Sequence, residues 1–76
     1  MTNIILPELG EGITQATMAC WHVQIGDYLQ EGQEVCEVVT DKASFVIDAP
    51  CAGRLKSIVI AEDREAQVGS VLGTIE

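Results

Sequence analysis

Basic residues are scarce in this sequence, which contains only four Lys and Arg against twelve Asp and Glu. The resulting net charge of −8 opposes binding to nucleic acid and to anionic membrane surfaces, because both carry negative charge themselves. A macromolecular partner is expected to offer a basic surface, although the same charge also serves to keep a small domain soluble. The charge therefore excludes two classes of partner without selecting a third.

Long apolar runs and targeting signals are also missing. No stretch approaches the roughly 18 residues that a membrane-spanning helix requires. The N-terminal segment "MTNIILPELG" has neither the basic flank nor the long apolar centre of a secretory signal. We therefore expect a soluble, intracellular chain.

Cysteine and histidine are too few, and too poorly spaced, to form a zinc site. Cys20, Cys36 and Cys51 are an odd number with no Cys-x-x-Cys pair, and His22 is the single histidine. One disulfide with a thiol left over is an option, but we favour buried thiols that act as small apolar side chains. His22 is expected to point outward from a strand, and no nucleophile or acid partner gives it a catalytic role.

Short apolar or alternating runs dominate what is present, and they predict β-strands. The runs are "NIIL", "TMACWHV", "EVCEVV", "SFVID", "RLKSIVI" and "SVLGTI", separated by Gly, Pro, Asp and Glu. Helical periodicity is sustained nowhere. Because 76 residues supply one core at most, we predict a single all-β domain over residues 1–76, a flattened barrel or sandwich of two antiparallel sheets.

An internal repeat relates the two halves of the chain. A shift of 37 residues superposes Met18 on Leu55, Trp21 on Ile58 and Val35 on Leu72, while a shift of 43 places "PELG" on "PCAG". The difference between the shifts indicates a loop insertion around "EGITQA". Two halves that are each too small to bury their own apolar face must pack about an approximate two-fold axis, with Trp21 expected in the shared core.

The stretch "VVTDKASFV" predicts a tight hairpin with Asp41 and Lys42 as its central turn residues. This register pairs Val39 with Ser44, and its side chains alternate between the two faces of the hairpin. The inner face is apolar and holds Cys36, Val38, Phe45 and Ile47. The outer face holds Glu37, Val39, Ser44 and Val46.

Lys42 is unusual at this turn, because Asp-Lys lacks the glycine that favours a primed two-residue turn and makes a type I turn the expectation. Exposed lysine at a turn is ordinary, and it suits solubility alone. A lysine at a hairpin tip has no neighbouring base or pocket, which argues against a nucleophilic or Schiff-base role. The approximate dyad places this tip at the opposite end of the molecule from both termini, where a covalent attachment point is easily reached.

The same residues resemble a lipoyl domain of the biotinyl/lipoyl carrier family, as found in the acyltransferase (E2) component of 2-oxo acid dehydrogenase complexes. The matching elements run from Ile4 to Glu76: "LPELGEGI", Trp21 with "GD" at 26–27, "EGQEVCEV", "TDKA" at 40–43, "AP" with Gly53, and "VG" before "LGTIE". "TDKA" alone is a weak signal, but in this order and spacing the set is specific. The resemblance implies a barrel-sandwich hybrid with lipoic acid amide-linked to Lys42.

The resemblance also implies a set of partners. A thiamine-diphosphate-dependent dehydrogenase (E1) reductively acylates the lipoyl group, the E2 catalytic core passes the acyl group to coenzyme A, and the flavoprotein dihydrolipoyl dehydrogenase (E3) reoxidises the dithiol. A lipoate ligase or lipoyl transferase attaches the group. The resemblance further implies that the domain itself performs no catalytic step, is a monomer in isolation, and forms the N-terminal part of a longer chain in the bacterial cytoplasm or the mitochondrial matrix.

Recognition in the family centres on the turn. Thr40, Asp41 and Ala43 flank the lysine and are read by the attaching enzyme. In the family, the loop from Glu8 to Gln15, which includes Glu11 and Gly12, lies beside the turn and helps partners to discriminate; its glycines also suffice simply to build a bend.

Two features depart from the family pattern. Val39 and Val46 replace acidic or polar residues on the outer face of the hairpin, and they either form a small apolar contact for a partner or are isolated surface residues. The second Gly-Asp turn is replaced by "AEDREAQVG", which leaves its local geometry open.

Alternative functions remain open beside the lipoyl carrier. The first is an unmodified interaction module of the same fold. The second is a biotinyl carrier, which usually has methionine on both sides of its lysine, whereas Lys42 lies between Asp41 and Ala43. Pyruvate, branched-chain and acetoin complexes fit the motifs equally, and "GEGI" leans away from the 2-oxoglutarate type.

Overall fold

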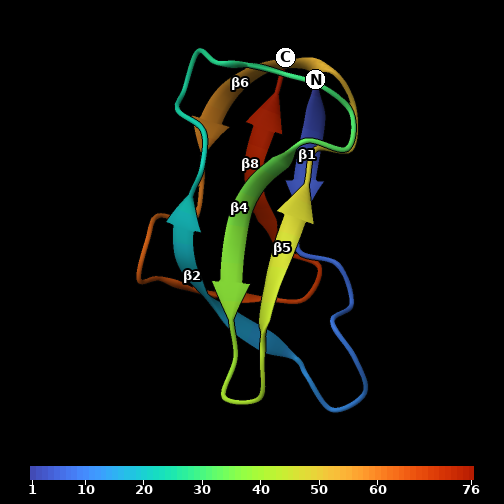
Figure 1. Ribbon diagram of the computed structural model, residues 1–76, viewed down its shortest axis with the longest axis vertical. Coiled ribbons are helices and arrows are strands. Elements are labelled where there is room, and N and C mark those ends of the chain that lie inside the picture. Colours follow the sequence, from blue (N-terminus) through green and yellow to red (C-terminus); the bar gives the residue numbers. More distant parts are fainter.

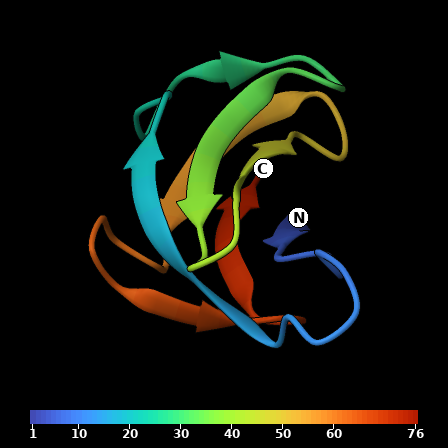
Figure 2. The same ribbon diagram turned by 60° about the horizontal axis from the view of Figure 1, so that its bottom comes forward.

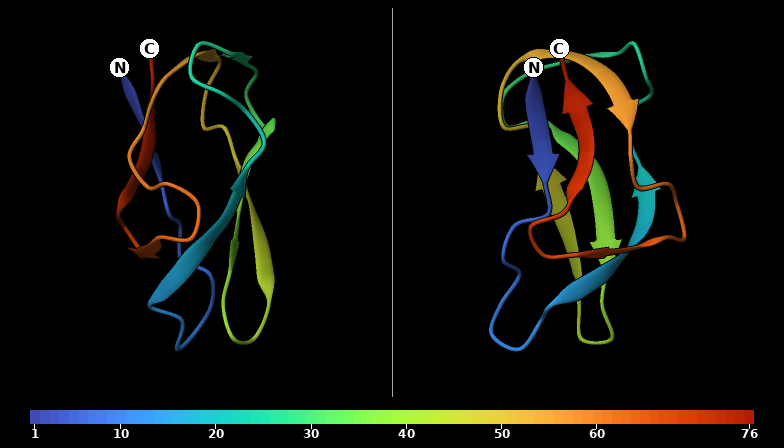
Figure 3. Two further views of the ribbon diagram at one scale, coloured as in Figure 1. Left: turned by 90° about the vertical axis from the view of Figure 1, so that its left-hand side faces the viewer. Right: turned by 180° about the vertical axis from the view of Figure 1, so that it is seen from behind.

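The protein folds into two four-stranded antiparallel sheets, in a computed structural model that describes all 76 residues (Figure 1). The strands are β1 (Thr2–Ile5), β2 (Gln15–Trp21), β3 (Tyr28–Leu29), β4 (Glu34–Val39), β5 (Ser44–Asp48), β6 (Gly53–Ile58), β7 (Glu65–Gln67) and β8 (Val71–Ile75). One sheet has the order β1-β8-β6-β3 and the other β5-β4-β2-β7. The predicted all-β sandwich is therefore confirmed, and its two layers are visible edge-on in Figure 3.

The approximate two-fold axis is visible in the strand order, because the 37-residue shift converts β2, β3 and β4 into β6, β7 and β8. Backbone hydrogen bonds repeat in the same way. The Gly26 N–H donates to the Leu55 carbonyl, and the Asp63 N–H donates to the Met18 carbonyl, both at 2.8 Å. The repeat predicted from sequence is therefore a structural repeat.

The short strands β3 and β7 were not predicted. Each is exchanged between the halves: β3 pairs with β6, and β7 pairs with β2. Strands of two and three residues are too short to display an alternating pattern, and only Leu29 and Ala66 within them are buried. The exchange closes the two sheets into the curled, barrel-like shape seen in Figure 2.

The core lies between the sheets and consists of fifteen buried apolar residues, with no buried polar side chain among them. Residues superposed by the repeat occupy it in pairs, such as Met18 with Leu55 and Val35 with Leu72. A fully buried side chain of this kind contributes roughly 1.5–3 kcal/mol to the free energy of folding. Because both halves line one core, neither has an apolar interior of its own.

Trp21 lies at the edge of this core rather than at its centre. Its ring is half-buried against the core, and its Nε1–H donates a hydrogen bond to the Ile60 carbonyl at 2.8 Å. Gly73 leaves room for the ring, since a Cβ at that position would lie 3.1 Å from the Trp21 ring and 2.7 Å from the Ser57 carbonyl oxygen. The predicted position of Trp21 in the core is thus confirmed only in part, and its hydrogen bond to Ile60 was not indicated by the sequence.

The altered turn after β6 keeps the geometry of its symmetry mate. Gly26 has φ of 98°, and Asp63, its equivalent under the repeat, has φ of 69°. Aspartate tolerates the left-handed region better than most residues with a side chain, so the turn forms without glycine.

The structure contains no helix with the length and apolar character needed to cross a membrane.

Candidate functional site

The β4–β5 hairpin has the register predicted from its sequence. Val39 lies opposite Ser44, Val38 opposite Phe45, and Glu37 opposite Val46. On the inner face Cys36, Val38 and Ile47 are buried and Phe45 is half-buried. The alternation of apolar and polar residues therefore fixed both the pairing and the faces of this element.

Thr40 organises the turn at the tip of the hairpin. Its N–H donates to the Ala43 carbonyl at 2.8 Å, and its Oγ1 accepts from the N–H groups of Lys42 and Ala43 at 3.2 and 3.1 Å. Neither Asp41 nor Lys42 has positive φ, which excludes a primed turn. Hydrogen bonds to the threonine hydroxyl thus stabilise a turn that contains no glycine.

Lys42 is exposed at this tip, and its amine has no ion-pair or hydrogen-bond partner within the chain. The termini lie together at the other end of the long axis, as Figure 1 shows, and the molecule measures 32 Å along that axis. β1 and β8 hold the termini together, with Thr2 opposite Ile75. The predicted separation of the lysine from both chain ends is confirmed.

A shallow polar groove of about 360 Å³ adjoins the lysine, and the glycine-rich loop forms its other side. Its lining residues are Gly12, Ile13, Thr14, Gln15, Thr40, Asp41 and Lys42. Gly12 has φ of 82°, which suits glycine, and Glu11 lies in the same loop but outside the groove. The loop therefore lies beside the turn, as expected.

Val39 and Val46 lie on the outer face of the hairpin, with 37% and 44% of their surface exposed. Glu37 lies directly opposite Val46 across the strand pair. The predicted placement of both valines on the outer face is confirmed.

The cysteines differ from one another in exposure. All three are free thiols, but only Cys36 is buried, while Cys20 and Cys51 are half-buried. Burial raises the pKa of the Cys36 thiol from 9.0 to about 12, with the neighbouring Cys20 as a second cause. The expectation of buried thiols therefore holds for Cys36 and is wrong for the other two.

His22 is exposed, as predicted. Its Nε2 lies 3.7 Å from Glu37 Oε1 and 4.0 Å from Cys20 Sγ. Both contacts use the same ring nitrogen, so the three residues do not form a relay in which a base is oriented by a third group.

The largest hollow lies elsewhere. It has a volume of about 560 Å³, is lined mainly by apolar residues including Trp21, Ile25 and Ile58, and shares no lining residue with the groove beside Lys42. No enclosed pocket surrounds the lysine. The site therefore presents the Lys42 amine to solvent.

A lysine is thus held out on a tight turn at one end of two β-sheets that an approximate dyad relates. The chain belongs to the biotin and lipoyl family: the family model described as "Biotin-requiring enzyme" matches residues 2–75. Within that family its fold is that of a lipoyl domain. The lipoyl domain of the 2-oxoglutarate dehydrogenase complex from Azotobacter vinelandii superposes with a TM-score of 0.78 and 26% identity, over 100% of this chain and 96% of that one.

Similar sequences occur in acyltransferase components of three complexes. The chain is 40% identical over 76 residues to the lipoamide acyltransferase component of the branched-chain alpha-keto acid dehydrogenase complex of Pseudomonas aeruginosa. It is 37% identical over 75 residues to the succinyltransferase component of the 2-oxoglutarate dehydrogenase complex of Bacillus subtilis. It is 42% identical over 72 residues to the acetyltransferase component of the pyruvate dehydrogenase complex of Mycobacterium bovis.

The match covers 95–99% of this chain but only 13–18% of those relatives. The chain therefore spans less than a fifth of each of them.

Proposed function

We propose that this chain is a lipoyl carrier domain of a 2-oxo acid dehydrogenase complex, with lipoate amide-linked to Lys42. The observation that carries the proposal is the exposed, unpartnered amine at the tip of the β4–β5 hairpin, at the far end of the molecule from both termini. An amide at this nitrogen removes the charge and adds a flexible arm that ends in a dithiolane. Family membership supports the choice of lysine, and the flanks Asp41 and Ala43 favour lipoate over biotin.

The chain's own residues supply position and leave the chemistry to partners. Hydrogen bonds of Thr40 stabilise the turn from which the arm extends. The E1 dehydrogenase transfers an acyl group to the arm, the E2 core passes it to coenzyme A, and E3 reoxidises the dithiol. Tethering makes these encounters intramolecular and raises the effective concentration of the arm at each active site.

The substrate is a 2-oxo acid of the pyruvate, branched-chain or 2-oxoglutarate type, or acetoin. Relatives in branched-chain, pyruvate and 2-oxoglutarate complexes match at 37–42% identity, so the glycine-rich loop does not exclude the 2-oxoglutarate type. We include all three in the proposal. If the chain continues beyond Glu76, a catalytic core of the same complex follows it.

Mass spectrometry after expression with a lipoate ligase and free lipoate tests the attachment. The intact mass should rise by one lipoyl group, and Lys42→Arg should abolish the rise. Lys56→Arg is the matched control, because Lys56 is the other lysine and is also exposed. It should leave the modification unchanged.

Three outcomes contradict the proposal. A lipoyl group found on Lys56 or on the N-terminus would show that Lys42 is not the attachment site. Persistent failure of a folded chain to take lipoate favours an unmodified interaction module. A biotinyl group, distinguishable by its mass, identifies the biotin carrier.

Incubating the lipoylated domain with E1 enzymes of the three complexes then assigns the 2-oxo acid. The enzyme of the cognate complex should acylate the arm with a much higher kcat/KM than the other two. Equal rates with all three would argue against a dedicated complex.

A further inference from the structure

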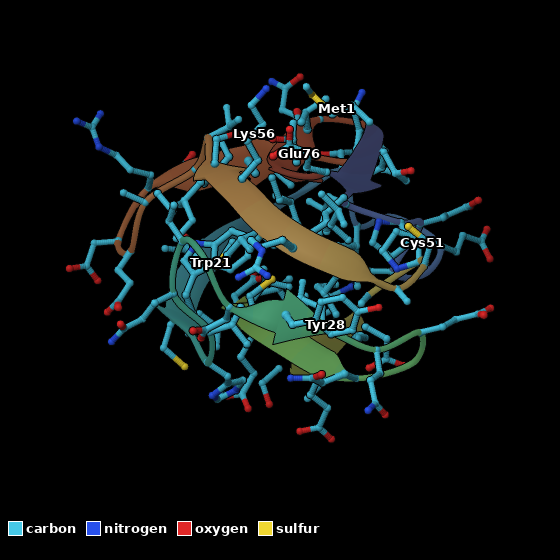
Figure 4. All side chains as sticks on the ribbon, turned by 90° about the horizontal axis from the view of Figure 1, so that it is seen from above. Met1, Trp21, Tyr28, Cys51, Lys56 and Glu76 are labelled. Carbon is cyan, nitrogen blue, oxygen red and sulfur yellow. The ribbon has the colours of Figure 1, made fainter.

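The two sheets differ sharply in charge although the approximate dyad relates them. The strands of the β5-β4-β2-β7 sheet contain four acidic residues and no Lys or Arg: Glu34, Glu37, Asp48 and Glu65. The strands of the β1-β8-β6-β3 sheet contain no acidic residue and two basic ones, Arg54 and Lys56. Figure 4 shows Lys56 on one side of the molecule together with Met1 and Glu76.

The fold does not require this asymmetry. Under the repeat, Glu37 corresponds to Thr74 and Asp48 to Ile5, so the same scaffold accepts uncharged residues at equivalent positions. Acidic residues on the outside of one sheet alone are therefore a property of that face and not of the architecture.

The acidic sheet also carries an apolar pair. Val39 and Val46 come from neighbouring strands and face outward, because the residues beside them, Val38 and Ile47, are buried in the core. Glu37 lies opposite Val46, and Asp48 is two residues further along β5 on the same side. We call the surface formed by Val39, Val46, Glu37 and Asp48 the valine face.

The valine face leads directly to the attachment turn. Lys42 is three residues beyond Val39, and it is the only basic residue in the β4–β5 hairpin and in the strands of this sheet. Lipoylation removes that positive charge. A lipoylated domain therefore offers an acidic surface with an apolar centre beside the arm, although His22 Nε2 lies 3.7 Å from Glu37 Oε1 at its edge. The acidic charges act over the Debye length of about 8 Å at physiological salt.

We propose that the valine face docks the E1 enzyme that acylates the arm, through an E1 surface that presents an apolar side chain bordered by Lys or Arg. This inference rests on the proposed carrier function. Charge complementarity identifies a basic partner and speeds the encounter, and the exposed valines supply the desolvated contact. Because docking does not alter the dithiolane, we expect changes in the valine face to affect the KM of E1 for the domain and to leave kcat unchanged.

Charge removal on the lipoylated domain tests the electrostatic part. With the E1 that acylates the wild-type domain fastest, Glu37→Gln with Asp48→Asn should lower kcat/KM about tenfold at low salt, with the loss in KM. The difference should shrink as salt rises to about 0.5 M. Glu31→Gln with Glu62→Gln is the control, because it removes the same charge from exposed positions outside both sheets.

Hydroxyl substitution tests the apolar part. Val39→Thr with Val46→Thr keeps shape and strand propensity and should lower kcat/KM by about threefold to tenfold at every salt concentration. Ile5→Thr with Val59→Thr is the control, since both residues are exposed but lie outside the valine face. Circular dichroism and urea unfolding establish that all variants remain folded.

The outcomes separate this inference from the function on which it rests. A wild-type domain that takes lipoate and is acylated, with variants that behave like their controls, overturns the docking inference alone. Variants that slow lipoate attachment but not acylation assign the face to the attaching enzyme and overturn it too. A wild-type domain that no E1 acylates overturns both proposals.

Discussion

At the scale of single residues, Cys36 shows how the core changes the chemistry of one side chain. Its thiol is buried in the shared interior, where no polar group compensates a charge, and its pKa rises to about 12. Desolvation is the larger cause, because a thiolate in an apolar environment loses its hydration. Cys36 therefore stays protonated and unreactive at neutral pH.

This shift predicts a pH dependence of stability. The folded state holds the Cys36 proton more tightly than the unfolded state, so the contribution is complete below pH 9 and is lost as the pH rises towards about 12. The free energy of unfolding of the wild type should fall by up to about 1.4 kcal/mol per pH unit within that window. Urea unfolding at several pH values measures the slope, with Cys36→Ala as the comparison. Parallel curves for the two proteins would contradict the assignment.

At the scale of elements, the β4–β5 hairpin depends on a turn that lacks its usual glycine. The Thr40 hydroxyl accepts two backbone N–H groups and donates to the Ala43 carbonyl at 3.1 Å. A side-chain oxygen that mimics a backbone carbonyl in this way is a recognised alternative to glycine in turns. Lys42 can therefore occupy a central turn position without strain.

Removing the hydroxyl tests this role. Thr40→Val should lower the free energy of unfolding by about 1 kcal/mol, because the two N–H groups lose their acceptor at an exposed site. Thr40→Ser keeps the oxygen and should recover most of the loss. Urea unfolding gives the stability, and amide exchange at Lys42 and Ala43 reports the turn directly. Equal stability of the Val and Ser variants would show that the hydroxyl is dispensable.

Sequence patterns predicted the long elements and missed the short ones for physical reasons. The hairpin register followed from alternation, since a slip by one residue would expose Val38 and bury Glu37. β3 and β7 escaped detection because two and three residues are too few to display an alternating pattern. The Thr40 hydrogen bonds and the groove beside Gly12 depend on side-chain rotamers and loop packing, which pattern alone does not encode.

At the scale of the whole molecule, the ends of the chain and the lysine turn occupy equivalent places about the dyad. β1 pairs with β8 as β5 pairs with β4. At the lysine turn the chain runs continuously from β4 to β5, whereas at the equivalent position the chain begins with β1 and ends with β8. The packing of the core does not depend on which of the two positions holds the chain ends.

Circular permutation tests that statement. Joining Glu76 to Met1 by a short flexible linker and opening the chain between Ala61 and Glu62 should give a protein within about 2 kcal/mol of the parent stability, since closing a short loop costs little. Lys42 should still accept lipoate, as measured by mass. The same linkage opened between Asp41 and Lys42 puts the break at the place equivalent to the chain ends, and this permutant should fold but lose modification. If it cannot fold while the permutant opened at Ala61 does, the two places are not equivalent.

The exchange of β3 and β7 between the sheets bears on how the protein is made. A nascent chain that has emerged only as far as Lys42 possesses neither the strand that completes the sheet of β2 nor the strands that β3 must join. The lysine is thus synthesised well before the scaffold that displays it. Under the proposed function, an attaching enzyme that requires the folded domain would modify Lys42 only after β6 and β7 have been synthesised, so truncated chains would stay unmodified.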